Sequence, residues 1–268
     1  MKSSLIITDV TRMREPGVCI AGYTRDCRCV RPVLPIGQLS ETWLYSDRRV
    51  VVRPFAVVQF DLVEPKSDPP HTEDWIIEPA YRAWQGLLTP DESKSLLDKL
   101  VDSDIQSIFG AEIRHGPGTY IMHGTGSRSL GTIRPSAVQD VLYEYRWSED
   151  RWDFRLAFTD QAGNPYKLAV TDLTFRYYLT SLRVRNHLAP AKAAQTLAET
   201  LQKTDVYLRI GLARPTWQKF PDRCYLQITG VYSFPDYLCG GCFADFALSE
   251  QESETDKRSM QNLRGKLF

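Results

Sequence analysis

The stretch TRMREPGVCIAGYTRDCRCVRPV, residues 11–33, decides the fold class of this chain. Val18 and Ile20, and then Cys27 and Cys29, alternate with their neighbours at period two, and a glycine with polar residues between the two pairs supplies turn chemistry. The pattern predicts a β-hairpin. Five arginines lie in the same stretch, and a guanidinium group binds phosphate oxygens in pairs. We therefore expect a small β-barrel with a basic rim.

Strand patterns continue beyond this hairpin. Residues 4–65 read as successive strands separated by Gly, Pro and charged turns, and KSDPP at residues 66–70 reads as a linker. A second β-rich block contains VQDVLYEYRW, WDFRLAFTD and YKLAVTDLTFRYYL, with a hairpin turn over residues 160–165 between the last two. Strands return as VYLRIGLARP and RCYLQITGVYSF. Most of the chain is therefore expected to be β-structure.

Two helices interrupt the strands. Thr89 has the position of an N-cap, proline follows it and acidic residues complement the helix dipole, so we expect a helix over residues 90–101. Residues 189–204, rich in Ala and Leu, predict a second helix. The polar segment from Ser249 onward is expected to be frayed or disordered. The fold class is therefore mainly β with two or more helices (α+β).

The composition is that of an ordinary globular protein and excludes two classes. Of the 268 residues, 43% are hydrophobic and 25% charged, and no apolar run approaches the roughly 20 residues that span a bilayer. The first residues, MKSSLIITDV, lack the apolar core and cleavage site of a signal peptide, so we expect a cytoplasmic protein with no membrane partner. The formal net charge of zero argues against a protein that coats nucleic acid indiscriminately.

Several stretches, taken in order, resemble one known family. They are GVCIAGY with CVRPV, the central SLGTIRP, LAFTDQAGNPYKLAVTDLTFR, and LRIGLARP with CYLQITGVY. Together they are similar to the dual OB-containing domain family, DuOB, and the similarity spans nearly the whole chain. The TRDCRC turn and the CGGC pair depart from the family pattern. The positions that match it are Cys19, Gly22, Arg31, Pro32, Gly131, Thr171 and Asp172.

The resemblance implies two OB-like β-barrel modules packed together, and binding of nucleic acid in a prokaryotic defence or repair setting. It carries no catalytic residues. The alternation of strands and helices predicts that the second module is inserted between parts of the first. We expect a first module with a helical extension over residues 1–110, a second module over 111–188, a helix and strands that complete the first module over 189–248, and a polar tail over 249–268.

The basic N-terminal region predicts a nucleic-acid surface. OB barrels bind single strands with a basic groove and aromatic platforms, because bases stack and phosphates attract cations. Residues 12–53 contain eight Arg against four acidic residues. The alternative is that the rings fill the cores or the contact between barrels, while Arg decorates solvent-facing strand positions. The expected contacts are Arg25, Arg28, Arg31, Arg48, Arg49, Arg53, Tyr23, Trp43 and Tyr45.

A second candidate site combines a glycine-rich stretch with the end of a strand. Residues 110–131 could place backbone N–H groups around a phosphate, but they match no P-loop, and a flexible connection between modules is the alternative. At Asp172, an Asx-type turn is the structural interpretation. The candidate ligand-binding residues are Arg128, Ser129, Thr171, Asp172 and Arg176.

Two cysteine pairs raise a metal hypothesis. Cys239 and Cys242 have the C-x2-C spacing of a zinc knuckle, and Cys27 with Cys29 would place two thiols on one face of a strand. Four thiolates meet if the C-terminus packs on the first hairpin. The alternative is that the cysteines are small buried apolar groups, and no other cofactor is expected.

The sequence predicts a non-catalytic protein that binds single-stranded RNA or DNA, with a defence-system protein as a further partner. The alternative is a small-ligand or nucleotide sensor, or a protein-interaction module, that uses the cleft between the two barrels. A nuclease or other enzyme is the third hypothesis, and no arrangement of nucleophile, base or metal ligands in the sequence supports it.

Overall fold

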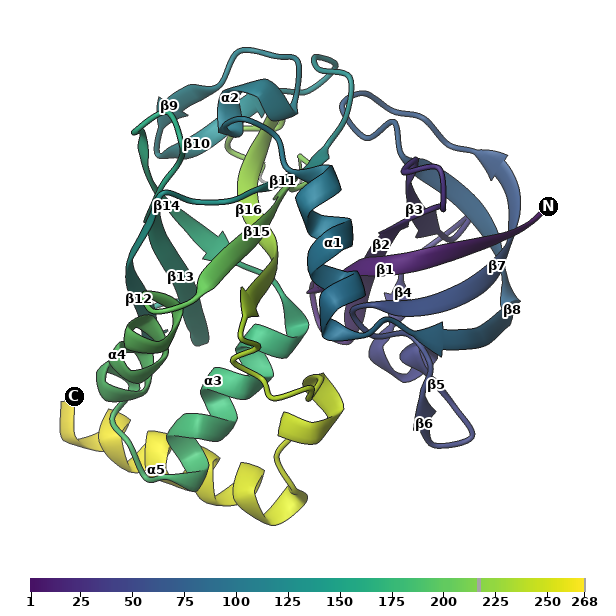
Figure 1. Cartoon of the computed structure of the whole chain (residues 1–268). Coiled ribbons are helices and arrows are strands. Elements are labelled where there is room, and N and C mark those ends of the chain that lie inside the picture. Colours follow the sequence, from purple (N-terminus) through teal and green to yellow (C-terminus); the bar gives the residue numbers. More distant parts are fainter. Residues whose placement is uncertain (216–217, 268) are drawn as a thin grey trace.

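Two β-sheets lie beside each other in the structure, with the N-terminal sheet at the right of Figure 1 and the second sheet at the left. The structure is a computed structural model that describes residues 1–215 and 218–267, the last six as backbone. Helix α1 (Pro90–Leu100) follows the last strand of the first sheet and lies between the two sheets, while α3 (Leu173–Arg185), α4 (Pro190–Leu201) and α5 (Glu250–Leu267) lie below the second (Figure 1). Segments far apart in the sequence therefore meet along the line between the sheets.

The first sheet closes into a five-stranded barrel. β1 pairs with β2, β2 with β3, β3 with β8, β8 with β7, and β7 returns to β1. The β3–β8 pair is parallel and the other four are antiparallel, which gives the Greek-key barrel of the OB-fold. The strands are β1 (Lys2–Arg12), β2 (Gly17–Tyr23), β3 (Cys29–Val33), β7 (Ala56–Pro65) and β8 (Asp74–Leu87), with β4 (Leu39–Ser40) beside β2.

The second sheet repeats this strand order without closing. Strands β12, β13, β14, β16 and β15 follow one another, and β14–β16 is the parallel pair in the position of β3–β8. No described residues pair β12 with β15; helix α4 (Pro190–Leu201) packs against β12 instead. The strands are β9 (Arg114–Gly116), β10 (Gly118–Met122), β11 (Leu130–Ile133), β12 (Ala137–Arg146), β13 (Arg151–Thr159), β14 (Pro165–Val170), β15 (Asp205–Leu212) and β16 (Arg223–Phe234).

The fold class predicted from sequence is confirmed, since a closed barrel and a half-barrel form two OB-like modules. The division of the chain differs from the prediction. Residues 189–248 do not complete the first module, because β15 and β16 are the fourth and fifth strands of the second sheet. Two successive helices separate the third and fourth strands of that sheet, and local sequence patterns do not indicate which sheet a strand joins after such a connection.

Helix boundaries show where local signals succeed and fail. Thr89 caps α1 through a capping box with Glu92, and α4 lies where its composition predicts it. The segment YKLAVTDLTFRYYL is predicted as part of a β-rich block, but only its first part is a strand: β14 ends at Val170, and helix α3 (Leu173–Arg185) follows. The Asp172 carboxylate accepts hydrogen bonds from two backbone N–H groups of the first turn. This N-cap outweighs the strand preference of the aromatic residues that follow it.

The C-terminal segment is ordered, contrary to the prediction of a frayed tail. It forms helix α5 (Glu250–Leu267), which charged pairs hold against α3. Arg183 donates to both carboxylate oxygens of Asp256, at 2.7 and 2.6 Å, and Arg185 donates to Glu252 at 3.0 Å. The polar composition of the segment therefore reflects ion pairing. The remaining elements are η1 (Glu41–Leu44), β5 (Tyr45–Ser46), β6 (Arg49–Val50), α2 (Ile105–Ile108) and η2 (Phe243–Phe246).

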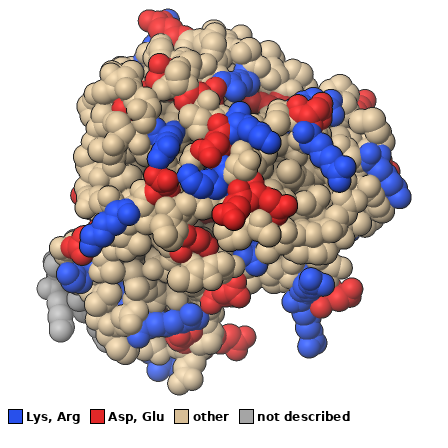
Figure 2. All heavy atoms as spheres, viewed as in Figure 1, with Lys and Arg blue, Asp and Glu red and all other residues tan. Residues whose placement is uncertain are grey.

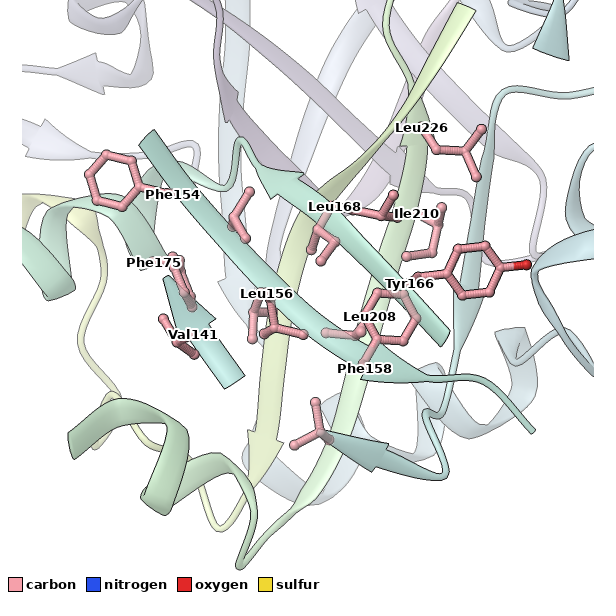
Figure 3. Close-up of a cluster of buried hydrophobic side chains, with 14 of the residues drawn as sticks. Val141, Phe154, Leu156, Phe158, Tyr166, Leu168, Phe175, Leu208, Ile210 and Leu226 are labelled. Carbon is pink, nitrogen blue, oxygen red and sulfur yellow. The ribbon is translucent and has the colours of Figure 1, made fainter. Parts of the chain in front are cut away.

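Each module has its own hydrophobic core. The second core fills the concave side of the half-barrel, and Figure 3 shows its strand residues interleaved with Phe175 of α3. The first core lies inside the closed barrel and includes Cys242 and Phe243 from the C-terminal segment. Burying one large apolar side chain contributes roughly 1.5–3 kcal/mol. Cys242 and Phe243 therefore help to stabilise the first barrel, although they follow the second module in the sequence.

Gly22 marks the closest approach of β1 and β2. A Cβ at this position would lie 2.4 Å from the carbonyl oxygen of Ile6. We expect Gly22→Ala to lower the free energy of unfolding by about 1–3 kcal/mol, because the backbone of β1 must move. Gly86→Ala on β8, where a Cβ meets nothing within 4 Å, is the matched control. Thermal unfolding of both variants checks this, and equal melting temperatures would contradict it.

Candidate ligand-binding cleft

The outer face of β2 and β3 borders a cleft of about 860 Å³ between the two modules. Ile20 and Val30 point into the first core, whereas Cys19, Ala21 and Arg31 face the cleft. This division follows from the alternation of side chains along a strand. The hairpin predicted from the opening stretch is confirmed, and its two faces have different roles.

Loops at both ends of β2 and β3 complete this wall. Met13 and Arg14 come from the connection after the first barrel strand, and Lys66 and Asp68 from the connection after the fourth. In OB barrels, the face of strands two and three and these two loops form the ligand-binding surface. The cleft therefore occupies the ligand face of the first barrel. The second module supplies the opposite wall with Leu130, Leu212, Ala213, Arg214, Gln227 and Thr229.

A buried ion pair joins the two modules beneath the cleft. Arg209 of β15 is 0% exposed, and its Nη2 lies 3.0 Å from Oδ2 of Asp9 on β1. The same guanidinium donates to the Tyr23 hydroxyl at 2.9 Å and to the Thr132 hydroxyl at 2.7 Å. Asp9 also accepts a hydrogen bond from the Thr229 hydroxyl at 2.5 Å. Groups from both modules thus surround both charges, and Arg209 Nη2 faces Asp9 as an ion pair without a hydrogen bond of its own.

Further charged contacts cross the wall of the cleft. Arg31 donates to Oδ1 of Asp74 at 2.5 Å, and Arg214 from the second module contacts Oδ2 of the same carboxylate. Glu73 accepts hydrogen bonds from the backbone N–H groups of Ser129 and Leu130, at 2.6 and 3.1 Å. Arg31 also lies 3.8 Å from the Glu73 carboxylate, so the two arginines face two carboxylates and this part of the wall is balanced in charge.

The rim of the cleft carries two further cations. Arg14 and Lys66 are exposed, and neither takes part in an ion pair between described residues. Lys66 donates only to the Pro35 carbonyl, at 3.2 Å. Asp68 is the acidic residue among the lining side chains of the two loops. Cations therefore predominate along the opening of the cleft.

The residues predicted to contact nucleic acid are not gathered on one surface. Tyr23 and Arg31 are buried between the modules, so they do not lie on an open face as predicted. Arg25 and Arg28 are exposed in the turn between β2 and β3, and Arg48 and Arg49 are exposed on the β5–β6 hairpin.

The two groups of exposed arginines contact different parts of β8. Arg28 lies over Trp75 and Arg49 over Trp84, each with its Cζ 5.3 Å from the ring centroid. The two tryptophans are nine residues apart on this strand, a distance of up to about 30 Å in extended chain. The expected basic rim is therefore divided between two places.

The remaining predicted contacts make internal interactions. Arg53 donates to the Gly240 carbonyl at 2.7 Å, and the Trp43 indole donates to the Pro79 carbonyl at 2.9 Å. Tyr45 packs edge-on against Phe243. These rings therefore serve packing, which is the alternative that the sequence left open.

Most of the second predicted set also has structural partners. Arg128 pairs with Asp102, Ser129 is buried against Glu73, and the Thr171 hydroxyl donates to the Ile228 carbonyl at 3.1 Å. Asp172 forms the Asx-type N-cap that was the structural interpretation, and it also accepts from the Val231 N–H at 2.9 Å. Arg176 differs from them in its partner, because its guanidinium contacts the Phe154 ring rather than a hydrogen-bonding group of a described residue.

The four cysteines do not fit a zinc site. Among the residues that the structure describes, no three His, Cys, Asp or Glu side chains converge as metal ligands. Cys27 lies in the turn with φ 59°, so it does not share a strand face with Cys29 as predicted. Burial raises the pKa of Cys29 to about 12, which keeps it a thiol. Cys239 is exposed, and Cys242 packs in the first core.

Sequence reasoning missed Arg14, Lys66 and Arg214. Arg14 lies inside the opening stretch, but its position in a connection rather than on a strand gave no signal. The OB strand order was the missing signal, because it identifies the loops that flank the ligand face.

The surface has no large area of one charge in the view of Figure 2, where Lys and Arg alternate with Asp and Glu. This distribution agrees with the formal net charge of zero. A ligand that recognises charge must therefore bind at a local group of charges, such as the cations at the rim of the cleft.

No helix among the described residues is long and apolar enough to cross a membrane.

The strand order and the position of the cleft define a protein of two OB-type modules with OB-type binding. The chain belongs to the dual OB-containing domain family, whose model matches residues 5–231. The match includes both sheets as far as β16 and ends before the C-terminal segment. Comparison with curated proteins gives no match.

Removing one partner of the buried ion pair should lower the stability of the folded protein. We expect Arg209→Met to lower the free energy of unfolding by about 3–5 kcal/mol, because the Asp9 charge stays buried without compensation. Asp9→Asn combined with Arg209→Met should recover part of that loss. Denaturant unfolding of the single and double variants checks this, and a strictly additive pair of losses would show that the two groups are not coupled.

Asp172 should make stability depend on pH. Burial raises its pKa from 3.8 to about 7, so between these values the folded protein keeps a proton that the unfolded chain has lost. The contribution of this group to the free energy of unfolding therefore falls as pH rises from about 4 to about 7 and is constant above. Unfolding of the wild type and of Asp172→Asn, which does not titrate, isolates the effect. A stability difference that does not change with pH would contradict it.

Proposed function

We propose that the protein binds single-stranded RNA or DNA in the cleft between its two modules and catalyses no reaction on it. The observation that carries the proposal is the presence of Arg14 and Lys66, cations without ion-pair partners among the described residues, on the two loops that flank the OB ligand face. Phosphates of a bound strand would contact these side chains. The proposal includes the cytoplasmic location that the N-terminal residues predict and the prokaryotic defence or repair setting that the family resemblance implies, with a defence-system protein as a further partner.

The charge of the cleft supports an anionic ligand. Asp74 is shared by Arg31 and Arg214, and Asp9 is neutralised by Arg209 from beneath. Glu73 also faces Arg31, so these internal pairs are balanced, and the cations that a phosphodiester backbone can neutralise are Arg14 and Lys66 at the rim. Electrostatic contacts to phosphates supply most of the non-specific affinity for nucleic acid and make it depend on salt.

The size of the cleft favours a second candidate function. A volume of about 860 Å³ lies within the roughly 300–1,000 Å³ typical of small-molecule sites. The protein would then sense a nucleotide or similar small ligand held between the modules. A ligand that binds only the folded state raises the melting temperature, so a thermal-shift screen with nucleotides and cyclic oligonucleotides separates this function from binding of longer strands.

Fluorescence anisotropy with labelled single-stranded oligonucleotides tests the leading proposal. We expect salt-sensitive binding with a Kd below about 100 μM, the weak end of non-specific affinities. Arg14→Ala combined with Lys66→Ala should weaken binding of all sequences. It should also reduce the slope of log affinity against log salt by about 0.7 for each phosphate that the variant no longer neutralises.

A second double variant distinguishes the cleft from the exposed hairpin. Arg48→Ala with Arg49→Ala removes the same charge from the β5–β6 connection, outside the cleft. If this variant weakens binding and the cleft variant does not, the hairpin is the contact surface. Absence of salt-sensitive binding by the wild type would refute the nucleic-acid proposal altogether.

A further inference from the structure

A second hollow, of about 1,030 Å³, lies against the second module. Its walls come from the β12–β13 hairpin, α3, α5 and the loop after β1. Unlike the cleft, it is lined by several aromatic rings, together with cations and the carboxylates of Glu15, Asp150 and Asp256, and we call it the aromatic groove. Arg12 and Met13 line both hollows and separate them. The lining includes Trp147, Trp152, Phe154, Tyr177, Arg176 and Lys257.

Arg176 is a half-buried cation without an acidic partner among the described residues. Its Cζ lies 4.7 Å from the centroid of the Phe154 ring, and its guanidinium forms no hydrogen bond or ion pair with a described residue. Glu15 and Asp153 are the carboxylates whose charges act on it without such a contact. Arg183, two turns later on the same helix, is bound by both oxygens of Asp256. Burial, together with the charge of nearby Arg12, lowers the pKa of Arg176 to about 10, still well above neutral pH. A desolvated cation is costly unless an anion pairs with it.

Trp147 is a half-buried ring that lines the same groove as this cation. It lies in the turn between β12 and β13, and its one ring contact among described residues is edge-on to Tyr145, with centroids 4.8 Å apart. The other rings are enclosed: Trp152 lies against Tyr143 and under Arg183, and Phe154 stacks on Tyr143. Figure 3 shows Phe154 at one end of the row of core side chains, where the core ends. Trp147 is therefore the ring best placed to stack with a ligand.

We propose that the aromatic groove binds a nucleotide, with its phosphate groups on Arg176 and its base stacked on Trp147. Lys257 of α5, which forms no ion pair among the described residues, adds a second positive charge to the lining. A planar guanidinium binds phosphate oxygens in pairs, and any base can stack on an aromatic ring. The volume accommodates a nucleotide and exceeds what a free phosphate needs. This site is separate from the cleft and does not depend on the function proposed for it.

Calorimetric titration of the full chain with ADP and with CDP tests the site. We expect a Kd below about 1 mM for both, as for a weak specific ligand. Arg176→Gln should weaken binding about 10-fold or more, from the loss of charged hydrogen bonds. Trp147→Ala should weaken binding about 5-fold or more, from the loss of base stacking. Arg176→Gln removes a half-buried charge, so the variant should fold with an unchanged or higher melting temperature.

Controls separate this site from the cleft and from a simple anion site. Arg114→Ala, an exposed arginine of β9, should leave ADP affinity unchanged, and so should the Arg14→Ala and Lys66→Ala pair. Equal affinity for inorganic pyrophosphate and ADP would overturn the role of Trp147 and with it the nucleotide assignment. Absence of binding of both nucleotides at about 1 mM, or binding that neither groove variant weakens, would overturn the site.

Discussion

The pairing of Arg209 with Asp9 fixes how the two modules sit together. A guanidinium with 0% exposure is tolerated only when every polar neighbour is correctly placed, and those neighbours come from both sheets: Asp9 and Tyr23 from one, Thr132 and Thr229 from the other. The ligand face of the closed barrel is thereby turned toward the half-barrel. The cleft exists because this contact covers only part of that face.

Much of the fold was predictable from the sequence, because alternating apolar residues and capping residues act locally. The first hairpin, α1 and α4 lie where these signals place them. The sequence did not predict which sheet the strands of residues 189–248 join, because the pairing of strands separated by α3 and α4 depends on long-range contacts. The helix after Asp172 was missed because aromatic residues favour a strand until the N-cap is recognised.

The candidate site shows a different limit. The number of arginines in residues 12–53 indicated the part of the chain that borders the cleft, but not which arginines face a ligand. Arg31 and Arg25 are alike in sequence, yet Arg31 is buried against Asp74 and Arg25 is exposed. A cation is available to a ligand only if no carboxylate of the folded protein already pairs with it. Arg14, Lys66 and Arg176 have no carboxylate partner among the described residues, and they lie in two loops and on a helix that was not predicted.

The C-terminal segment crosses back from the second module to the first. Cys242 and Phe243 enter the first core, and α5 then returns to α3 through ion pairs. The modules are thus tied at two separate places, which restricts any hinge motion between them. A ligand entering from solvent meets walls that are already in position, so little of its binding energy is consumed in ordering the protein, and recognition rests on shape and charge rather than on closure.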